Sequence, residues 1–237
     1  MNLGSRILRI VAVAAAVPLV SASSELDRAP IQYHVAEVRG KLTRELPLPE
    51  QRVSAGSDLA SGAVLKTGWR STATLTVAAA ATSFAVGPRT RVRLAATRPG
   101  LLLEIEKGRL RALFEKYAGD AAPDRMVRTP SAVLAVRGTE YGVAVNRRGD
   151  TEVVVFAGEV SVREVGGREA PVNVGAGMTC SIPRGGPPSV PREHHMNPHA
   201  WDHGEMPHGM DGPGAGGMAG DGTTRHHGSA GSMRHGA

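Results

Sequence analysis

The chain has 237 residues, of which 41% are apolar and only 3% aromatic, so a core must be built mainly from Val, Leu and Ala. Its single cysteine, Cys180, excludes an intramolecular disulfide. The net charge of +6 suits anionic partners, but the basic residues lack the interleaved aromatics on which nucleic-acid bases stack. The composition therefore argues against a disulfide-stapled domain and against nucleic acid as a partner.

The first 22 residues have the pattern of an export signal. Arg6 and Arg9 form a positive start, and residues 10–20 form an apolar run that is followed by small residues. This run is shorter than the ~20 residues that a transmembrane helix needs. We therefore expect residues 1–22 to be a signal peptide, the mature protein to be periplasmic or extracellular, and no transmembrane span. An uncleaved N-terminal anchor is the alternative.

Residues 23–190 are expected to form one β domain. Apolar and polar residues alternate at 71–77, Tyr141, Val143 and Val145 alternate within 139–145, and residues 152–156 are rich in β-branched valine, all of which predicts strands. Polar segments that contain glycine separate such runs and are typical of turns. Many short strands joined by turns predict an all-β fold of the sandwich or barrel-like kind.

Two stretches of this domain carry more specific expectations. Gly108 is expected to interrupt the chain between an apolar strand and residues 110–118. The composition of 110–118 is compatible with a helix, but its alternation favours a strand. Cys180 lies in a stretch typical of a strand, so we expect its thiol to be buried as a small hydrophobe.

Residues 191–237 lose the alternation and become rich in Gly, His, Met and Pro, so we expect a disordered tail. Imidazole suits Cu, Ni and Zn, and thioether sulfur favours Cu(I). The tail is therefore either a flexible copper or nickel site or a glycine-rich segment without a ligand. The candidate ligands are His194, His195, His199, His203, His208, His226, His227, Met196, Met206 and Met210.

Three motifs follow one another between residues 63 and 182. The first is Thr-Gly-Trp-Arg-Ser at 67–71, and the second is Glu-Lys-Gly-Arg-Leu-Arg at 106–111. The third and most specific begins with Val-Arg-Thr-Pro at 127–130, continues with Val-Arg-Gly-Thr-Glu-Tyr and ends in a valine-rich strand. In order and spacing these motifs resemble the FecR domain family, and the resemblance covers residues 63–182.

The motif residues are interpreted as structural. Pro130 fixes its own φ and biases Thr129 to an extended conformation. Gly138 precedes a strand, which predicts a bulge or a positive φ. The motifs of metalloproteases and P-loops do not occur in the sequence, so we expect no enzyme. The residues interpreted in this way are Arg128, Thr129, Pro130, Arg137, Gly138 and Thr139.

The resemblance implies an all-β, jelly-roll-like sandwich outside the cytoplasmic membrane. Founding members of the family are signal transducers between an outer-membrane siderophore receptor and a cytoplasmic sigma factor. The apolar run of this sequence lacks their preceding anti-sigma segment. The expected function is therefore a non-catalytic, exported binding module whose partner is an envelope protein or polymer. The alternatives are an envelope metal-handling protein, with Cu or Ni on the tail, and a FecR-like signalling regulator.

Overall fold

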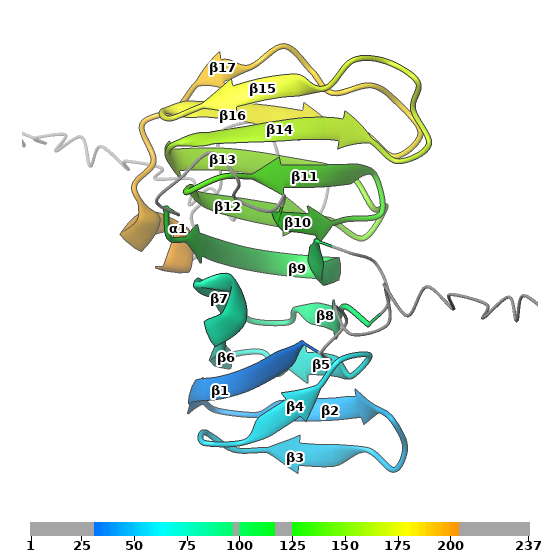
Figure 1. Cartoon of the computed structure of the whole chain (residues 1–237), viewed down its shortest axis with the longest axis vertical. Coiled ribbons are helices and arrows are strands. Elements are labelled where there is room, and N and C mark those ends of the chain that lie inside the picture. The colour runs from blue at the N-terminus through cyan, green and yellow to red at the C-terminus, as the bar shows by residue number, and fades with distance from the viewer. Residues whose placement is uncertain (1–30, 97–99, 117–124, 204–237) are drawn as a thin grey trace, which may run out of the picture.

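The structure is a computed structural model that describes residues 31–96, 100–116 and 125–203. Nearly all of these residues belong to two facing β-sheets that share one long strand, β9 (Leu101–Phe114) (Figure 1). The N-terminal strands lie at one end of the molecule and the C-terminal strands at the other. This arrangement confirms the all-β sandwich that the sequence predicts.

Sheet A contains, in spatial order, β4 (Asp58–Ala60), β1 (Gln32–Arg39), β6 (Thr72–Val77), β7 (Thr82–Val86), the C-terminal half of β9, β12 (Glu140–Val145), β13 (Thr151–Ala157), β16 (Met178–Ile182) and β17 (Arg192–Glu193). Sheet B contains β3 (Gln51–Val53), β2 (Leu42–Leu46), β5 (Val64–Thr67), β8 (Arg91–Leu94), the N-terminal half of β9, β10 (Arg125–Arg128), β11 (Ala132–Val136), β14 (Glu159–Glu164) and β15 (Val172–Gly175). Neighbouring strands are antiparallel, except for the parallel pair of β9 and β10. A 3-10 turn, η1 (Ala78–Ala80), and one short helix, α1 (Pro198–His203), complete the described elements.

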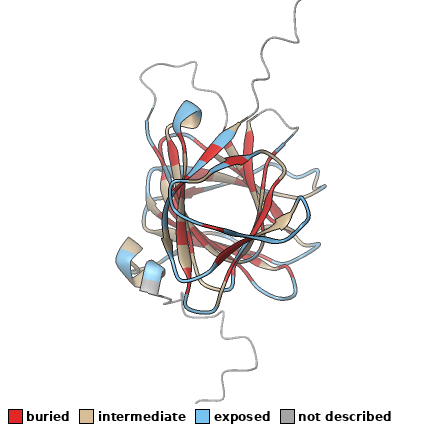
Figure 2. Cartoon of the chain, turned by 90° about the horizontal axis from the view of Figure 1, so that it is seen from below, coloured by how far each residue is buried: buried red, intermediate tan, exposed pale blue. Residues whose placement is uncertain are grey.

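The core lies between the two sheets, where buried residues of facing strands meet (Figure 2). In β6 the side chains of Ala73, Leu75 and Val77 are buried, whereas the threonines between them are partly exposed. Such alternation arises because successive strand residues point to opposite faces. The strands expected at 71–77, 139–145 and 152–156 are confirmed, and Cys180 is buried as predicted.

Strand β9 passes from sheet B to sheet A at Gly108. Gly108 has a φ of 99°, and a Cβ there would lie 2.5 Å from the Cα of Thr90. The expected interruption at Gly108 is therefore wrong, because a glycine in this conformation bends the strand without ending it. Residues 110–114 form strand rather than helix, with Leu110 and Phe114 in the core. Arg109 and Arg111 consequently face outward from sheet A.

The third motif forms a corner at the edge of the two sheets. The hydroxyl of buried Thr129 accepts hydrogen bonds from the backbone N–H groups of Ser131 and Ala132, at 3.2 and 2.8 Å. Gly138 has the expected positive φ, 63°. The hydroxyl of buried Thr139 donates to the carbonyl of Glu159 at 2.8 Å. These side chains close turns between strands.

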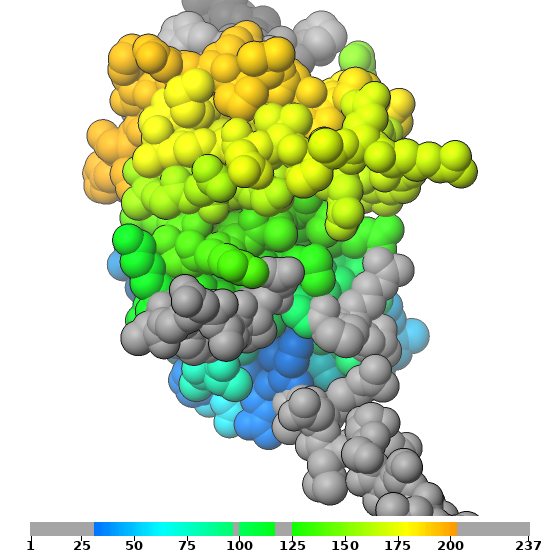
Figure 3. Space-filling model, turned by 45° about the horizontal axis from the view of Figure 1, so that its top comes forward, coloured from blue at the N-terminus to red at the C-terminus, as the bar shows by residue number. Residues whose placement is uncertain are grey.

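The folded chain continues beyond residue 190, where the sequence analysis places the start of a disordered tail. Residues 191–203, the C-terminal segment, add β17 to sheet A and place α1 against β9 and β12. In Figure 3 the orange atoms of this segment lie at the top and along one side of the molecule, against the yellow atoms that precede them in the chain. The boundary at 190 is therefore corrected. Trp201 is only 2% exposed and buries a large apolar side chain, which the glycine- and histidine-rich sequence around it does not indicate.

No helix among the described residues has the length and apolar character needed to cross a membrane.

Candidate functional site

A groove with a volume of about 520 Å³ opens on the outer face of sheet A, beside helix α1. Strands β1, β6, β7 and β9 form its floor and walls, and α1 closes one side. We call it the arginine groove because four arginines contribute to its lining. Its charged residues are Glu37, Arg39, Arg70, Arg109, Arg111 and Asp202.

The groove is hollow because small residues flank the arginines of β9. On the neighbouring strand β7, Ala85 pairs with Arg111, and the chain continues to Gly87, which donates its N–H to the carbonyl of Arg109 at 2.9 Å. On the other side of β9, Arg111 pairs with Gly142 of β12. Strand residues at these registers place their side chains on the same face, so two long arginine side chains stand between small neighbours.

Arg111 is fully engaged within the chain. Its guanidinium donates two hydrogen bonds to the carboxylate of Asp202, at 2.7 and 3.0 Å, and a third to Glu140 at 2.8 Å. Burial lowers the pKa of Arg111, but the bonds to Asp202 and Glu140 outweigh this effect and the pKa is raised. Arg111 therefore fastens α1 to sheet A as a permanent cation.

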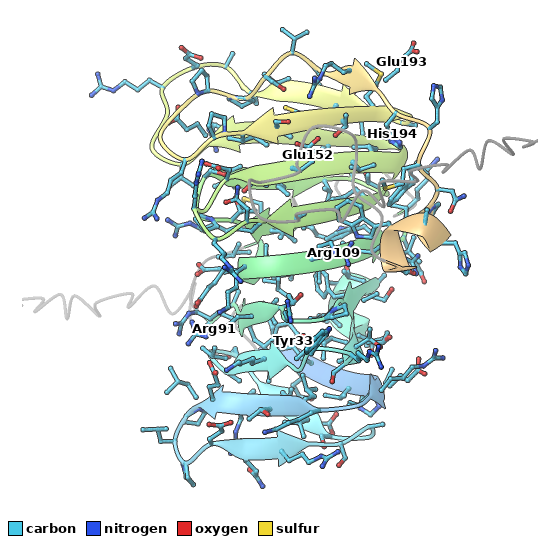
Figure 4. The ribbon with its side chains drawn as sticks, turned by 180° about the vertical axis from the view of Figure 1, so that it is seen from behind. Tyr33, Arg91, Arg109, Glu152, Glu193 and His194 are labelled. Carbon is cyan, nitrogen blue, oxygen red and sulfur yellow. The ribbon has the colours of Figure 1, made fainter. Side chains whose placement is uncertain are left out.

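Arg109 lies two residues before Arg111, on the same face of β9 and beside α1 (Figure 4). Its Nη1 atom is shielded from solvent and has no hydrogen-bond partner among the described residues. Burial lowers the pKa of Arg109, and the charge of nearby Asp202 acts in the opposite direction. A shielded guanidinium nitrogen without an acceptor is energetically costly, so this position calls for an anion.

Arg70 extends the cationic lining of the groove to the turn before β6. Arg70 is exposed and has no bonded partner among the described residues. Beside it, Trp69 is 71% exposed, with the guanidinium of Arg89 4.5 Å from its ring centre. Tryptophan and arginine are both enriched among the residues that contribute most of the binding energy at protein interfaces.

The C-terminal segment is held on sheet A mainly by Trp201. A Cβ at Gly142 would lie 2.5 Å from the Trp201 ring, so only glycine leaves room for the indole. Ala144 and Val154 also pack against the indole, and the ring centre of Phe156 lies 6.4 Å from that of Trp201. The indole thereby fixes Asp202 next to the arginines of β9.

The described residues do not bring the expected metal ligands together in one site. His194 uses both ring nitrogens: Nε2 lies 3.1 Å from the carbonyl of Val155, and Nδ1 accepts the N–H of Met196 at 3.1 Å. The carbonyl requires a donor, so Nε2 carries the proton and His194 has no free lone pair for a metal. Met196 packs against the Trp201 cluster. His194 and Met196 therefore hold the C-terminal segment in place.

The remaining metal candidates form no site in the described part of the chain. His195 and His199 are exposed, and no group of three His, Cys, Asp or Glu side chains is arranged for a metal within residues 31–96, 100–116 and 125–203. His203 is the last residue of α1. The others lie outside the described residues: His208, His226, His227, Met206 and Met210.

The structural motif residues lie apart from the groove. Arg128 pairs with Glu104 on sheet B at 3.8 Å, and Thr129 and Thr139 bond backbone groups at corners. The groove arginines were missed as a site, although Arg70, Arg109 and Arg111 belong to the first two motifs. The available signal was the spacing of Arg109 and Arg111, since residues two apart on a strand share a face.

Residues 63–161 match a family model, described as FecR protein. This part of the chain is therefore similar to the FecR family. The match confirms the resemblance carried by the three motifs and includes Arg70, Arg109 and Arg111 of the groove. The C-terminal segment lies outside the matched range, so the groove combines residues of the matched region with a segment beyond it.

Two crystal structures of a candidate anti-sigma factor from Parabacteroides distasonis ATCC 8503 are similar to the chain. One, at 2.50 Å resolution, has 16% identity and a TM-score of 0.46, over 55% of this chain and 59% of that one. The other, at 1.65 Å, has 17% identity and a TM-score of 0.49, over 60% and 65%. This chain thus spans less than two thirds of either structure. No curated protein matches it significantly.

Proposed function

We propose that this protein is an exported, non-catalytic regulatory module of the cell envelope, and that it binds its partner in the arginine groove. The observation that carries the proposal is an open groove lined by Arg70 and Arg109, neither of which pairs with a carboxylate in the described part of the chain. Arginine is permanently protonated, so it holds an anion well and transfers protons poorly. The chemistry of the groove favours binding over catalysis.

Export is supported by the N-terminal sequence pattern, and a regulatory role is supported by the FecR family match. Sheet A holds Arg109 and Arg111 of the groove on the rigid strand β9, which suits a recognition surface. The partner expected from the sequence is an envelope protein or polymer, and the groove narrows this to one that carries negative charge.

The test is site-specific photo-crosslinking in the source cells, with the crosslinking residue placed at Arg70 in the groove. The matched control places it at Arg163, an exposed residue of β14 on sheet B. We expect the protein in the envelope or periplasmic fraction, with a discrete crosslinked product from position 70 only. A cytoplasmic protein, or the same products from both positions, would contradict the proposal.

A second candidate function is metal handling by residues 204–237. It is favoured by one observation: half of the ten histidines and methionines named as ligands lie in this stretch of the sequence. Soft sulfur and borderline imidazole ligands favour copper over magnesium or calcium. This activity is separable from partner binding, because the arginine groove contains no methionine and only one histidine, His199, among its described lining residues.

A further inference from the structure

The arginine groove already contains one peptide carboxylate, and it belongs to the chain itself. Asp202 of α1 receives two parallel hydrogen bonds from Arg111 of β9. This paired geometry is the strongest form of arginine–carboxylate recognition. The outer face of β9 is therefore shaped to take a carboxylate that a peptide segment presents.

Arg109 repeats the position of Arg111 without its partner. The two residues lie two apart on β9, so their side chains leave the strand about 7 Å from one another on one face. Arg111 has three hydrogen bonds to carboxylates, whereas the guanidinium of Arg109 has none among the described residues. Asp202 contributes only a longer-range attraction to Arg109. A second carboxylate would satisfy Arg109 as Asp202 satisfies Arg111.

The groove has room for more than an ion. Its volume of about 520 Å³ extends from Arg109 to Arg70, a second arginine without a bonded partner in the described structure. Arg39 also lines it but is paired with Glu37 at 2.7 Å. Trp69, which precedes Arg70 in the sequence, is an exposed aromatic whose ring already contacts the guanidinium of Arg89. Two separated cations fit an extended segment with two acidic side chains.

We propose that the arginine groove binds an acidic peptide segment of a partner protein, with one carboxylate on Arg109 and another on Arg70. The inference rests on the proposed function, which makes the groove the partner surface, and it names the chemistry of that partner. A peptide is favoured over an acidic polysaccharide because the carboxylate that the groove already holds is presented by a peptide. Binding therefore weakens as salt screens the arginine–carboxylate attraction.

The experiment is calorimetric titration of the full chain with a six-residue peptide of alternating Asp and Glu. The matched probe is the same peptide with Asn and Gln. We expect the acidic peptide to bind and the amide peptide to bind at least tenfold more weakly, since bonds to charged groups are worth more than neutral ones. Equal binding of the two peptides would overturn the inference.

Variants then locate the site. Arg109→Gln and Arg70→Gln should each weaken the acidic peptide about tenfold or more, while Arg163→Gln on sheet B should leave the affinity unchanged. Arg70 is exposed, so its variant tests the site even where Arg109→Gln alters the fold. Unchanged affinity in Arg70→Gln and in a folded Arg109→Gln overturns the inference.

Competing anions and the crosslinking result complete the test. Inorganic phosphate or polygalacturonate that binds more tightly than the acidic peptide would assign the groove to another ligand class and overturn the inference. A groove-specific crosslink combined with no acidic-peptide binding leaves the proposed function intact and overturns the ligand. Peptide binding without a groove-specific crosslink supports the ligand chemistry and contradicts the proposed function.

Discussion

The indole of Trp201 occupies the space that a side chain at Gly142 would fill. A Cβ at Gly142 would lie 2.5 to 2.8 Å from three atoms of the ring. Trp201 is 59 positions further along the sequence, by 201 − 142, and is 2% exposed. The pair couples the C-terminal segment to the centre of sheet A, beside the arginine groove.

This coupling predicts a specific double-mutant result. Gly142→Ala should destabilise the chain by about 1–3 kcal/mol, because the added methyl displaces a packed ring. In a Trp201→Ala background the same substitution should cost less than about 0.5 kcal/mol, because the clash is gone. Urea unfolding of the four chains measures the difference. Equal costs in both backgrounds would show that the indole does not sit on Gly142.

The second prediction concerns where the folded chain ends. A chain that stops at residue 203 should melt at the temperature of the full chain, since β17, α1 and Trp201 remain. A chain that stops at residue 190 loses this burial, worth about 3 kcal/mol for a buried tryptophan, and should melt about 5–10 °C lower. Differential scanning calorimetry decides between them. Identical melting of both chains would restore the boundary at 190.

Asp202→Asn tests whether the C-terminal segment competes for the groove. The substitution removes one negative charge and releases Arg111, while Trp201 still anchors α1. The acidic peptide should therefore bind severalfold more tightly, with a steeper salt dependence. Glu164→Gln on β14 of sheet B is the matched control and should leave the affinity unchanged. Weaker binding to Asp202→Asn would mean that Asp202 assists the ligand.

The fourth prediction assigns copper binding to residues 204–237. Removing them after residue 203 should abolish most copper uptake. His194→Ala in the full chain should leave uptake unchanged and lower the melting temperature, because both nitrogens of His194 hold the C-terminal segment. Imidazole binds metal only when neutral, so affinity should fall as the pH drops through ~6.5, the ordinary pKa of histidine. Copper uptake that persists in the shortened chain contradicts the assignment.

The strands were predictable from the sequence wherever one face is wet. Thr72–Val77 shows the alternation directly, because its threonines face outward and its apolar residues face the core. Gly108 was misjudged because glycine both breaks strands and bends them. Only the strands on either side, which belong to different sheets, distinguish the two roles.

The groove could not be predicted in the same way. Arg70 and Arg109 are 39 positions apart, by 109 − 70, and only the pairing of β6, β7 and β9 brings the turn that holds Arg70 near β9. Trp201 stands alone in a polar, glycine-rich stretch, so composition suggested disorder. A single tryptophan anchors the segment because Gly142 of β12 has no side chain and leaves room for the indole. The hydrophobic periodicity of the sequence does not show this contact.

The most direct test of the account is a crystal structure of the full chain with the alternating Asp–Glu peptide bound at saturation. We predict a peptide carboxylate oxygen within hydrogen-bond distance of the guanidinium of Arg109, which lines the groove. We also predict a second peptide carboxylate on Arg70. A saturated complex in which the peptide lies elsewhere and the guanidinium of Arg109 binds no peptide carboxylate would contradict this prediction.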